Sequence, residues 1–366
     1  LFPDSAKAMW GAGSDLQIFH DGSNSFIQDA GTGFLVVNAT TEVRINNAAN
    51  DETMARFIAD GASSLNYDNT VKLATASTGI EVGASGVNAT IKTHSAGTSN
   101  LTLGVNAGNT IESGGNYNTL VGDEAGTALT TGDNNVAVGY GALDAGTTAS
   151  YIIAIGYNAL GANNTGDNNI AIGNAALDAN TTGTPNLAIG RNALGTCTTG
   201  IFNIGIGHSA LEALTDAQYN IAVGSNALDA LTEGDSNVAI GYAAGSALTT
   251  ANYCNLIGHG AGNVIETGGY NNMFGGAAGD AITTGSHNVG MGHNAAGAVT
   301  TGTYNVAIGN YALDAVTTTS GHTAVGYSAL SATTDTGNTA VGYLACRDTT
   351  GGAYNVAVGY ESLLLN

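Results

Sequence analysis

Proline, cysteine, tryptophan and basic residues are scarce in this 366-residue sequence, which has 2 Pro, 3 Cys, 1 Trp and 7 Lys and Arg together. The three cysteines are odd in number and far apart, which excludes a disulfide framework and a zinc-binding spacing. We interpret Cys197, Cys254 and Cys346 as small apolar residues that fill a core. Only Arg191 and Arg347 of the seven bases follow residue 95, so no basic patch is available for nucleic acid or an anionic membrane.

Long apolar runs and a signal-peptide pattern are also missing. No stretch reaches the roughly 18 consecutive apolar residues that suggest a membrane-spanning helix, so we expect no membrane insertion. The 28 acids and 7 bases give a net charge of −21, which favours solubility and suits a saline medium. The sequence starts at Leu1 and stops seven residues after Gly359, inside a repeat, so we expect a segment of a longer protein.

Glycine, by contrast, is abundant. The 55 glycines show no Gly-X-Y period, which excludes collagen, and the 43% of hydrophobic residues argue against disorder. A glycine preceded by an apolar residue recurs along the chain, and thirteen of its fifteen spacings are 17 residues, with one of 18 and one of 16. Such a period marks one unit stacked on itself. These marker glycines are Gly104, Gly122, Gly139, Gly156, Gly173, Gly190, Gly207, Gly224, Gly241, Gly258, Gly275, Gly292, Gly309, Gly326, Gly342 and Gly359.

The residues around each marker glycine form columns, which we number from that glycine as position 0. Position −1 is always apolar, position −3 is usually Val, Ile or Leu, and position −2 is mostly Ala, which predicts a strand with one bulky and one small face. Position −4 is Asn in 13 of 16 copies, and position +3 is Ala in every copy but the last, which has Ser362. The residues that represent these columns are Gly139, Gly156, Gly173, Gly190, Gly207, Gly224, Gly241, Asn135, Asn169, Asn186, Asn220, Asn237, Ile172, Ile189, Ile240, Ala171 and Ala239.

The columns predict an all-β fold over residues 98–366: a parallel β-solenoid, or β-roll, of about sixteen 17-residue repeats. Seventeen residues are too few for a three-sided coil, and glycine, threonine and asparagine disfavour helices, so two-sided coils fit better. Stacking places identical residues above one another and lets the Asn side chains form a ladder. Fifteen steps of about 4.8 Å give a rod of roughly 70 Å.

Residues 1–97 lack the period and predict a hairpin-rich β module. The strands expected there include Leu16–Phe19, Ser25–Gln28, Phe34–Val37 and Leu65–Tyr67, and Leu73–Val82 is expected to form strands broken at Gly79. Asp21-Gly22 and Asp60-Gly61 are hairpin-type turns. The only plausible helical stretch is Asn50–Ala59.

Burial within the solenoid follows from the same columns. We expect the aliphatic column at position −1 (Val138, Ile172, Ile240 and Ile308) to be buried within the chain. A coil this small has too thin a core to stand alone. We therefore expect the alanine columns (Ala137, Ala171 and Ala239 at −2; Ala142, Ala176 and Ala244 at +3) to be close-approach faces of a lengthwise homotrimer.

The strings NVAVGYGALDAGTT, NIAIGNAALDANTTG and NVAIGNYALDAVTTT resemble the repeats of two families. One is the β-roll head of trimeric autotransporter adhesins, and the other is the repeat region of tailed-bacteriophage tail fibres. DLQIFHDGSNSFI and RFIADGASSLNYDNTVKLATASTGI in the first third look like fibre modules of marine phages. Adhesin heads usually have shorter repeats, so the 17-residue unit favours the phage family. The resemblance implies a homotrimer and transfers no catalytic residue.

The sequence signals for catalytic or metal-binding sites are weak. His208, His259 and His293 share position +1, where three copies on a threefold axis could bind a metal. That column also holds tyrosine, arginine and serine, which favours an exposed edge. The acidic residues in the turns and after the leucine column could bind calcium, but a role as solvated surface residues explains them better. We therefore predict no metal site, no cofactor and no catalytic residue, because the acids are spread evenly and no deep groove is expected.

The sequence leads to one main functional hypothesis. It is a structural and adhesive fibre: a trimeric phage tail-fibre segment in the virion, with other tail or baseplate proteins and a host-surface receptor as partners. The alternative is a trimeric adhesin head on a bacterial surface. A less favoured alternative is a solenoid that binds ice or polysaccharide, since the Thr-Thr pairs lie in turns and do not form an unbroken array.

Overall fold

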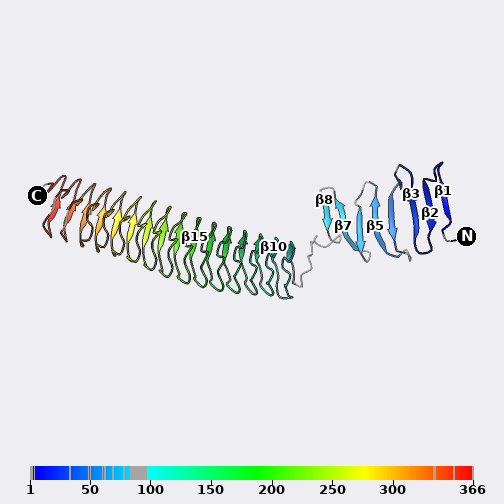
Figure 1. Ribbon diagram of the computed structural model, residues 1–366, viewed down its shortest axis with the longest axis horizontal. Helices are drawn as coiled ribbons and strands as arrows, with labels where there is room; N and C mark the ends of the chain where they lie inside the picture. The colour runs from blue at the N-terminus through cyan, green and yellow to red at the C-terminus, as the bar shows by residue number, and fades with distance from the viewer. Residues whose placement is uncertain are drawn as a thin grey trace. The chain divides into compact units, whose positions relative to one another are not determined.

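The computed structural model describes residues 3, 5–32, 34–47, 49, 51–59, 61, 63–67, 70–76, 79–82, 97–332, 335–348 and 351–364. Contacts divide the chain into two compact units, Leu1–Ile91 and Lys92–Asn366, each described below by itself. No helix occurs among the described residues, so the fold is all-β (Figure 1).

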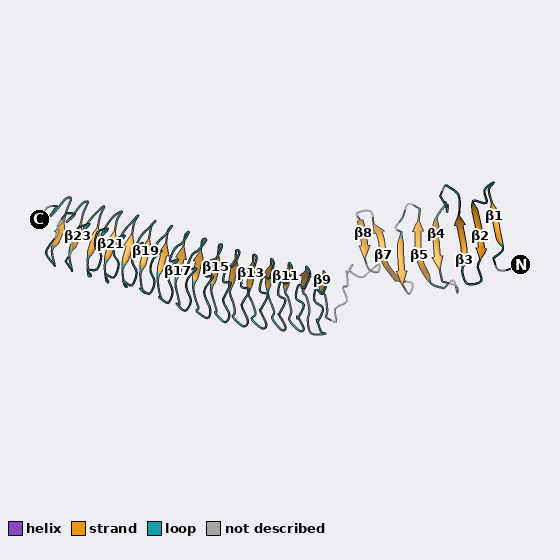
Figure 2. Cartoon of the chain, viewed as in Figure 1, coloured by secondary structure: helices purple, strands orange, loops and turns teal. Residues whose placement is uncertain are grey.

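The first unit contains two antiparallel sheets (Figure 2). The three-stranded sheet has the order β1-β2-β3 and the five-stranded sheet the order β4-β5-β6-β7-β8. After β2, the Asp21 carboxylate accepts hydrogen bonds from the backbone N–H groups of Ser23 (2.9 Å) and Asn24 (2.7 Å), which fixes the turn into β3. The bounds are β1 (Lys7–Trp10), β2 (Leu16–His20), β3 (Ser25–Asp29), β4 (Glu42–Asn46), β5 (Thr53–Ile58), β6 (Ser64–Tyr67), β7 (Thr70–Ala76) and β8 (Gly79–Val82).

Two local predictions for this unit are wrong. The stretch 53–58 within the expected helix is strand β5, because it pairs with β4 on one side and with β6 on the other. Local helix propensity is a weak preference that such tertiary pairing overrides. The expected strand Phe34–Val37 is irregular backbone with no ladder partner. Asp60, from the second predicted turn, lies outside the described residues.

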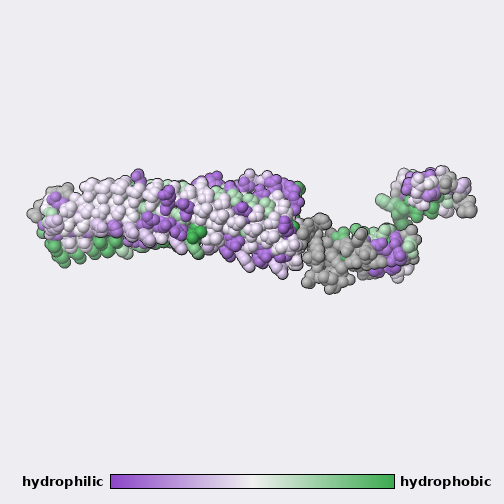
Figure 3. All heavy atoms as spheres, turned by 90° about the horizontal axis from the view of Figure 1, so that it is seen from below, coloured by the Kyte–Doolittle hydropathy of each residue, from purple (hydrophilic) through white to green (hydrophobic). Residues whose placement is uncertain are grey.

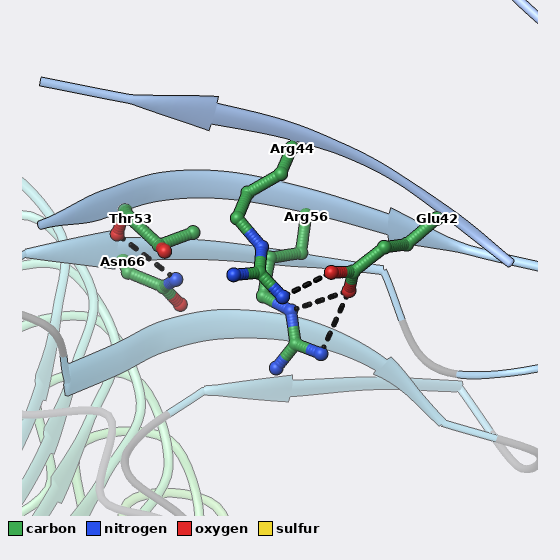
Figure 4. A network of polar contacts seen from close by, with 5 residues as sticks. All are labelled: Glu42, Arg44, Thr53, Arg56 and Asn66. Atoms are coloured by element: carbon green, nitrogen blue, oxygen red, sulfur yellow. Dashed lines mark hydrogen bonds and ion pairs between the residues drawn. The ribbon is translucent and has the colours of Figure 1, made fainter. Parts of the chain in front are cut away.

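An ion-pair network joins β4 and β5 (Figure 4). Arg44 and Arg56 are cross-strand partners, and both donate to the Glu42 carboxylate, Arg56 through Nε at 3.1 Å and Nη2 at 2.9 Å. These hydrogen bonds, led by the one from Arg56, lower the pKa of Glu42. The Glu42 carboxylate therefore bridges the two basic side chains and offsets their repulsion across the strands.

The second unit is the predicted parallel β-solenoid, which the structure confirms. Its sixteen strands pair in sequence order from β9 to β24, and every pair is parallel. Partners occupy the same repeat position, as in Ile153↔Ile170 and Ala154↔Ala171. The bounds are β9 (Leu101–Leu103), β10 (Thr119–Val121), β11 (Val136–Val138), β12 (Ile153–Ile155), β13 (Ile170–Ile172), β14 (Leu187–Ile189), β15 (Ile204–Ile206), β16 (Ile221–Val223), β17 (Val238–Ile240), β18 (Asn255–Ile257), β19 (Asn272–Phe274), β20 (Val289–Met291), β21 (Val306–Ile308), β22 (Thr323–Val325), β23 (Thr339–Val341) and β24 (Val356–Val358).

The marker glycine ends each strand at a corner that no other residue fits. Gly173 has φ of +141°, and a Cβ built on it would lie 2.4 Å from the carbonyl oxygen of Gly190 in the next coil. Gly156 has φ of +136° and the same distance to the carbonyl oxygen of Gly173. The stacked corners are thus in backbone contact, and this contact together with the positive φ explains why glycine recurs at this position.

Beyond the corner each coil turns back through a second segment that is not a regular strand. Its backbone is nevertheless bonded from coil to coil, as in Leu160 N–H to the Ala176 carbonyl (3.0 Å) and Ala162 N–H to the Asp178 carbonyl (2.9 Å). Residues at positions +2 and +4 have positive φ, for example Asn158 at 49° and Leu160 at 54°. Both sides of the coil therefore contribute backbone ladders, which satisfies polar groups that the narrow coil buries.

The core consists of columns at positions −2, +3, +4 and +7, and the side-chain volumes at −2 and +4 compensate each other in many coils. Alanine at −2 is combined with leucine at +4 in eight of the sixteen coils, as with Ala171 and Leu177, both fully buried. Where −2 is larger, +4 is glycine: a Cβ on Gly262 would lie 2.9 Å from Leu256 Cδ2. The column at +7 adds aliphatic side chains such as Leu214. In these coils positions −2 and +4 compensate each other, whereas the space beside Gly245 is filled by Leu228 and Leu256 of the neighbouring coils.

The predicted orientation of the strands is wrong. Alanine at −2 points inward and is fully buried at Ala171 and Ala239, whereas Ile240 at −1 is 41% exposed and Ile308 is 37% exposed. Ile172 and Ile189 are half-buried on the same outward face. The reason is the buried leucines of the returning segments, such as Leu177 at +4 and Leu248 at +7, which fill the interior and leave room only for a small residue on these strands.

Candidate interaction surface

The asparagines at position −4 form a ladder inside the solenoid. Asn135 Nδ2 donates to the Ala149 carbonyl in the next coil (2.8 Å), and the Asn135 backbone N–H donates to Asn118 Oδ1 in the previous coil (2.9 Å). Asn186 and Asn237 repeat both contacts, and Asn169 and Asn220 also donate through Nδ2 to the next coil. The amides thus satisfy buried backbone groups of the neighbouring coils, which is a structural role.

Three coils replace this asparagine, with Ile152, Cys254 and His322. His322 is fully buried, and its Nδ1 accepts from the Asn338 backbone N–H at 3.3 Å while Nε2 meets Thr319 Oγ1 at 2.9 Å. Burial lowers the pKa of His322, with a smaller opposing effect of the contact with Asn338. A neutral imidazole with the proton on Nε2 therefore takes the place of the amide.

The alanine columns are not available as close-approach faces. Ala137, Ala171 and Ala239 at position −2 are fully buried within the chain, and so are Ala142, Ala176 and Ala244 at position +3. The prediction that one of these columns lines a contact between chains is therefore wrong. Their small size serves the interior of the single chain, where the leucines at +4 occupy the remaining space.

The outward face of the sixteen-stranded sheet carries the bulky side chains instead. Positions −3 and −1 form two parallel aliphatic columns, with Ile153 36% exposed, Ile155 37% exposed and Met291 45% exposed. Hydrophobic residues gather in a band along one side of this unit (Figure 3). We call the residues at positions −3 and −1 of strands β9 to β24 the aliphatic face. Monomeric proteins rarely expose so long an apolar strip, which makes the face a candidate interaction surface.

Aromatic columns flank the aliphatic face at positions −5 and +1. Tyr253, Tyr270, His287 and Tyr304 at −5 form one continuous stack with ring centroids 5.1, 4.7 and 4.9 Å apart. At +1, Tyr327, Tyr343 and Tyr360 stack at 5.5 and 5.2 Å. A tyrosine ring combines an apolar body with a polar tip, so it suits the rim of an apolar interface.

The aromatic residues at position −5 adopt a backbone conformation that disfavours them. Tyr253, Tyr270 and Tyr304 have φ of 58°, 59° and 58°, in the left-handed region where Asn and Gly are preferred. Asn134 occupies the same position with φ of 59°. Local folding does not explain a half-exposed tyrosine there, which supports a role in contact with another molecule. This column was not predicted above, although the 17-residue spacing of Tyr253 and Tyr270 in the sequence is a signal for it.

The histidines considered as metal ligands lie apart. His208 contacts the Arg191 guanidinium, His259 stacks on Tyr242 with centroids 5.3 Å apart, and Nδ1 of His293 lies 3.0 Å from the Gly276 carbonyl oxygen. Within the part of the chain that the structure describes, no three His, Cys, Asp or Glu side chains come together as a possible metal site.

Other titratable groups are buried without a chemical partner. The pKa of the Cys197 thiol is raised to about 12 and that of Cys254 to about 11, mainly by desolvation, so both thiols are protonated and inert. The half-buried Asp178 and Asp314 at position +5 also have pKa values raised by desolvation. They stand in separate coils, and neither belongs to a group of three His, Cys, Asp or Glu side chains among the described residues.

Comparison with protein-family models, with curated proteins and with solved structures finds no match in any of the three sets. Among the described residues, no helix has the length and apolar character needed to cross a bilayer. The aliphatic face with its aromatic borders is therefore the feature from which a function can be argued.

Proposed function

We propose that the chain is a structural and adhesive fibre segment that works as a homotrimer, with three solenoids in contact along their length. The observation that carries this proposal is the aliphatic face, which runs along all sixteen strands and stays partly exposed in the single chain. Burial of such a face supplies the hydrophobic free energy that the thin core of one coil lacks.

A second copy of the same chain is the partner that fits this face. Its columns repeat once per coil, every about 4.8 Å, and a partner with the same pitch can match all of them. Fifteen steps give a strip of roughly 70 Å, and with a width of about 15 Å it presents about 1,000 Å². A stable interface buries about 800 Å² per partner, so the strip is large enough.

The first unit adds support. Among its residues whose side chains are described, Ala55, Ser64 and Ala74 alone are buried, while Ile27 and Phe57 are 64% and 48% exposed. A single antiparallel layer with so little core needs a covering surface. Association of identical chains provides it, because the same sheet of each copy can pack against the others.

The resemblance of the repeats to phage tail fibres supports a role for this trimer in a virion, where it would connect other tail or baseplate proteins to a host-surface receptor. The same surface would serve the head of a bacterial adhesin. Ice binding receives less support, because threonine hydroxyls of the turns already donate to the next coil, as Thr130 does to the Thr147 carbonyl (2.9 Å) and Thr300 to that of Thr317 (2.9 Å).

The test is the mass of the assembly in solution, measured by light scattering for the native chain and for Ile240→Asp combined with Ile308→Asp. We expect a trimer for the native chain and monomers for the variant, with the β circular dichroism retained because both side chains point outward. Thr182→Asp combined with Thr199→Asp, on exposed turns, is the matched control and should remain trimeric. A native chain that stays monomeric at micromolar concentration would overturn the proposal.

A further inference from the structure

We infer that Asn255 and Asn272 set the register in which the solenoids of the assembly align. This inference rests on the proposed self-association through the aliphatic face and adds to it a pair of residues that determines specificity. It concerns the alignment of one chain against another, which association alone leaves open.

The aliphatic face is nearly uniform from β11 to β21, whereas outside this range position −3 is Thr in β10, β22 and β23. From β11 to β21, position −3 is Val, Ile or Leu in nine of eleven strands, and the two exceptions are the adjacent strands β18 and β19. Position −1 is apolar in every coil. A chain that slides by one coil against its partner therefore meets almost the same surface again, so the aliphatic contacts alone specify register weakly.

The two exceptions are Asn255 and Asn272, which form one polar pair in the middle of this face. Their backbones are ladder partners, and Asn255 Nδ2 donates to Asn272 Oδ1 at 2.7 Å. Leu256 and Met273, the next residues, point into the core and are fully buried, so both amides point outward. Each side chain is half-buried by its own chain.

An amide has more donors and acceptors than this one hydrogen bond uses. When the chains are in register, the amides of all copies lie at the same two levels and can bond to one another. When one chain slips by one coil, an amide at one level faces aliphatic side chains and loses those partners. A single buried Asn fixes register in coiled coils by this mechanism, at some cost in stability.

The experiment uses two single-cysteine chains, Val289→Cys and Thr323→Cys, assembled together and then oxidised. Positions 289 and 323 lie two coils apart on the same column, about 9.6 Å along the axis. A disulfide requires Cα atoms within about 7 Å, so 289–289 and 323–323 links form in register, whereas a slip of two coils brings position 289 level with position 323 and forms the 289–323 link. The native cysteines are buried and do not compete. Linked peptides are identified by mass spectrometry.

We expect links of the in-register kind alone in chains that keep both asparagines. In the Asn255→Val, Asn272→Val background, the share of 289–323 links should rise at least about tenfold, because no register then leaves an amide unpaired. Moving the pair, with Ile170→Asn and Leu187→Asn added to that background, should suppress these links again. This rescue separates a register effect from a local folding effect.

The remaining outcomes contradict either the register role of the two asparagines or the proposed self-association. If the valine background gives in-register links alone, or if the relocated pair fails to suppress the 289–323 links, Asn255 and Asn272 do not set the register, although the assembly stands. If the native chain forms no links of either kind and has the mass of a monomer, the proposed self-association itself is wrong.

Discussion

Met273 occupies the space that a side chain at Gly279 would need. A Cβ built on Gly279 would lie 2.7 Å from Met273 Sδ, and Met273 is fully buried. In other coils the relationship is reversed, with Ala307 on the strand and Leu313 at position +4. The two positions thus share one volume inside each coil, and this coupling can be measured.

Gly279→Leu and Met273→Ala should each destabilise the solenoid, and the double variant should cost less than the sum of the two. The first overpacks the coil by about 1–3 kcal/mol, and the second leaves a cavity that costs about 2–5 kcal/mol. Leucine is compatible with the backbone there, since Leu313 has φ of 59° and Gly279 has φ of 63°. Urea unfolding of the four chains gives the coupling free energy, and strict additivity would contradict the shared volume.

Gly173→Ala should destabilise the stack by about 3 kcal/mol or more, since a Cβ there meets the Gly190 backbone and alanine disfavours the positive φ. Gly351→Ala is the control, because a Cβ at that position meets no atom within 4 Å. The free energies of unfolding of both variants are measured against the native chain. Equal effects of the two substitutions would mean that the corner contact is unimportant.

Asn220→Ala should lower the free energy of unfolding by about 2–5 kcal/mol, because it leaves two buried backbone groups without a partner. These are the Gly234 carbonyl, 2.8 Å from Asn220 Nδ2, and the Asn237 N–H, 3.0 Å from Asn220 Oδ1. Asn174→Ala, on the exposed surface, should change stability by less than about 0.5 kcal/mol. Thermal unfolding distinguishes the two, and a tolerated Asn220→Ala would refute a structural role for the ladder.

The stability conferred by His322 should depend on pH. Its pKa in the folded chain is lowered from the ordinary value of 6.5 by burial, so the unfolded chain binds the proton more tightly. Stability is therefore retained above pH 6.5 and lost as the pH falls toward the folded-state pKa. His322→Asn, which restores the amide, should remove this loss. The free energy of unfolding of both chains is measured in urea between pH 7.5 and pH 5. If it changes with pH by the same amount in both chains, protonation of His322 does not contribute to the pH dependence.

The sequence alone predicts the repeat and most of what the backbone does with it. The marker glycines predict the corners, because a positive φ with a neighbouring backbone in contact admits no other residue, as at Gly173. The Asn column predicts a ladder for a similar reason: a side chain repeated at one level of every coil meets its own copies. Strands β2, β3 and β6 also lie close to the predicted ranges.

The tertiary structure decided which side of each strand faces the interior. Alternation of Ala239 with Ile240 identifies two faces, but the pattern is the same whichever face is buried. The outcome depends on Leu228 and Leu248, which come from the turn segments and fill the interior, so alanine fits inside and isoleucine remains outside. The sequence therefore determines that the chain has a bulky and a small face, whereas packing within a 17-residue coil determines that the bulky face lies on the outside.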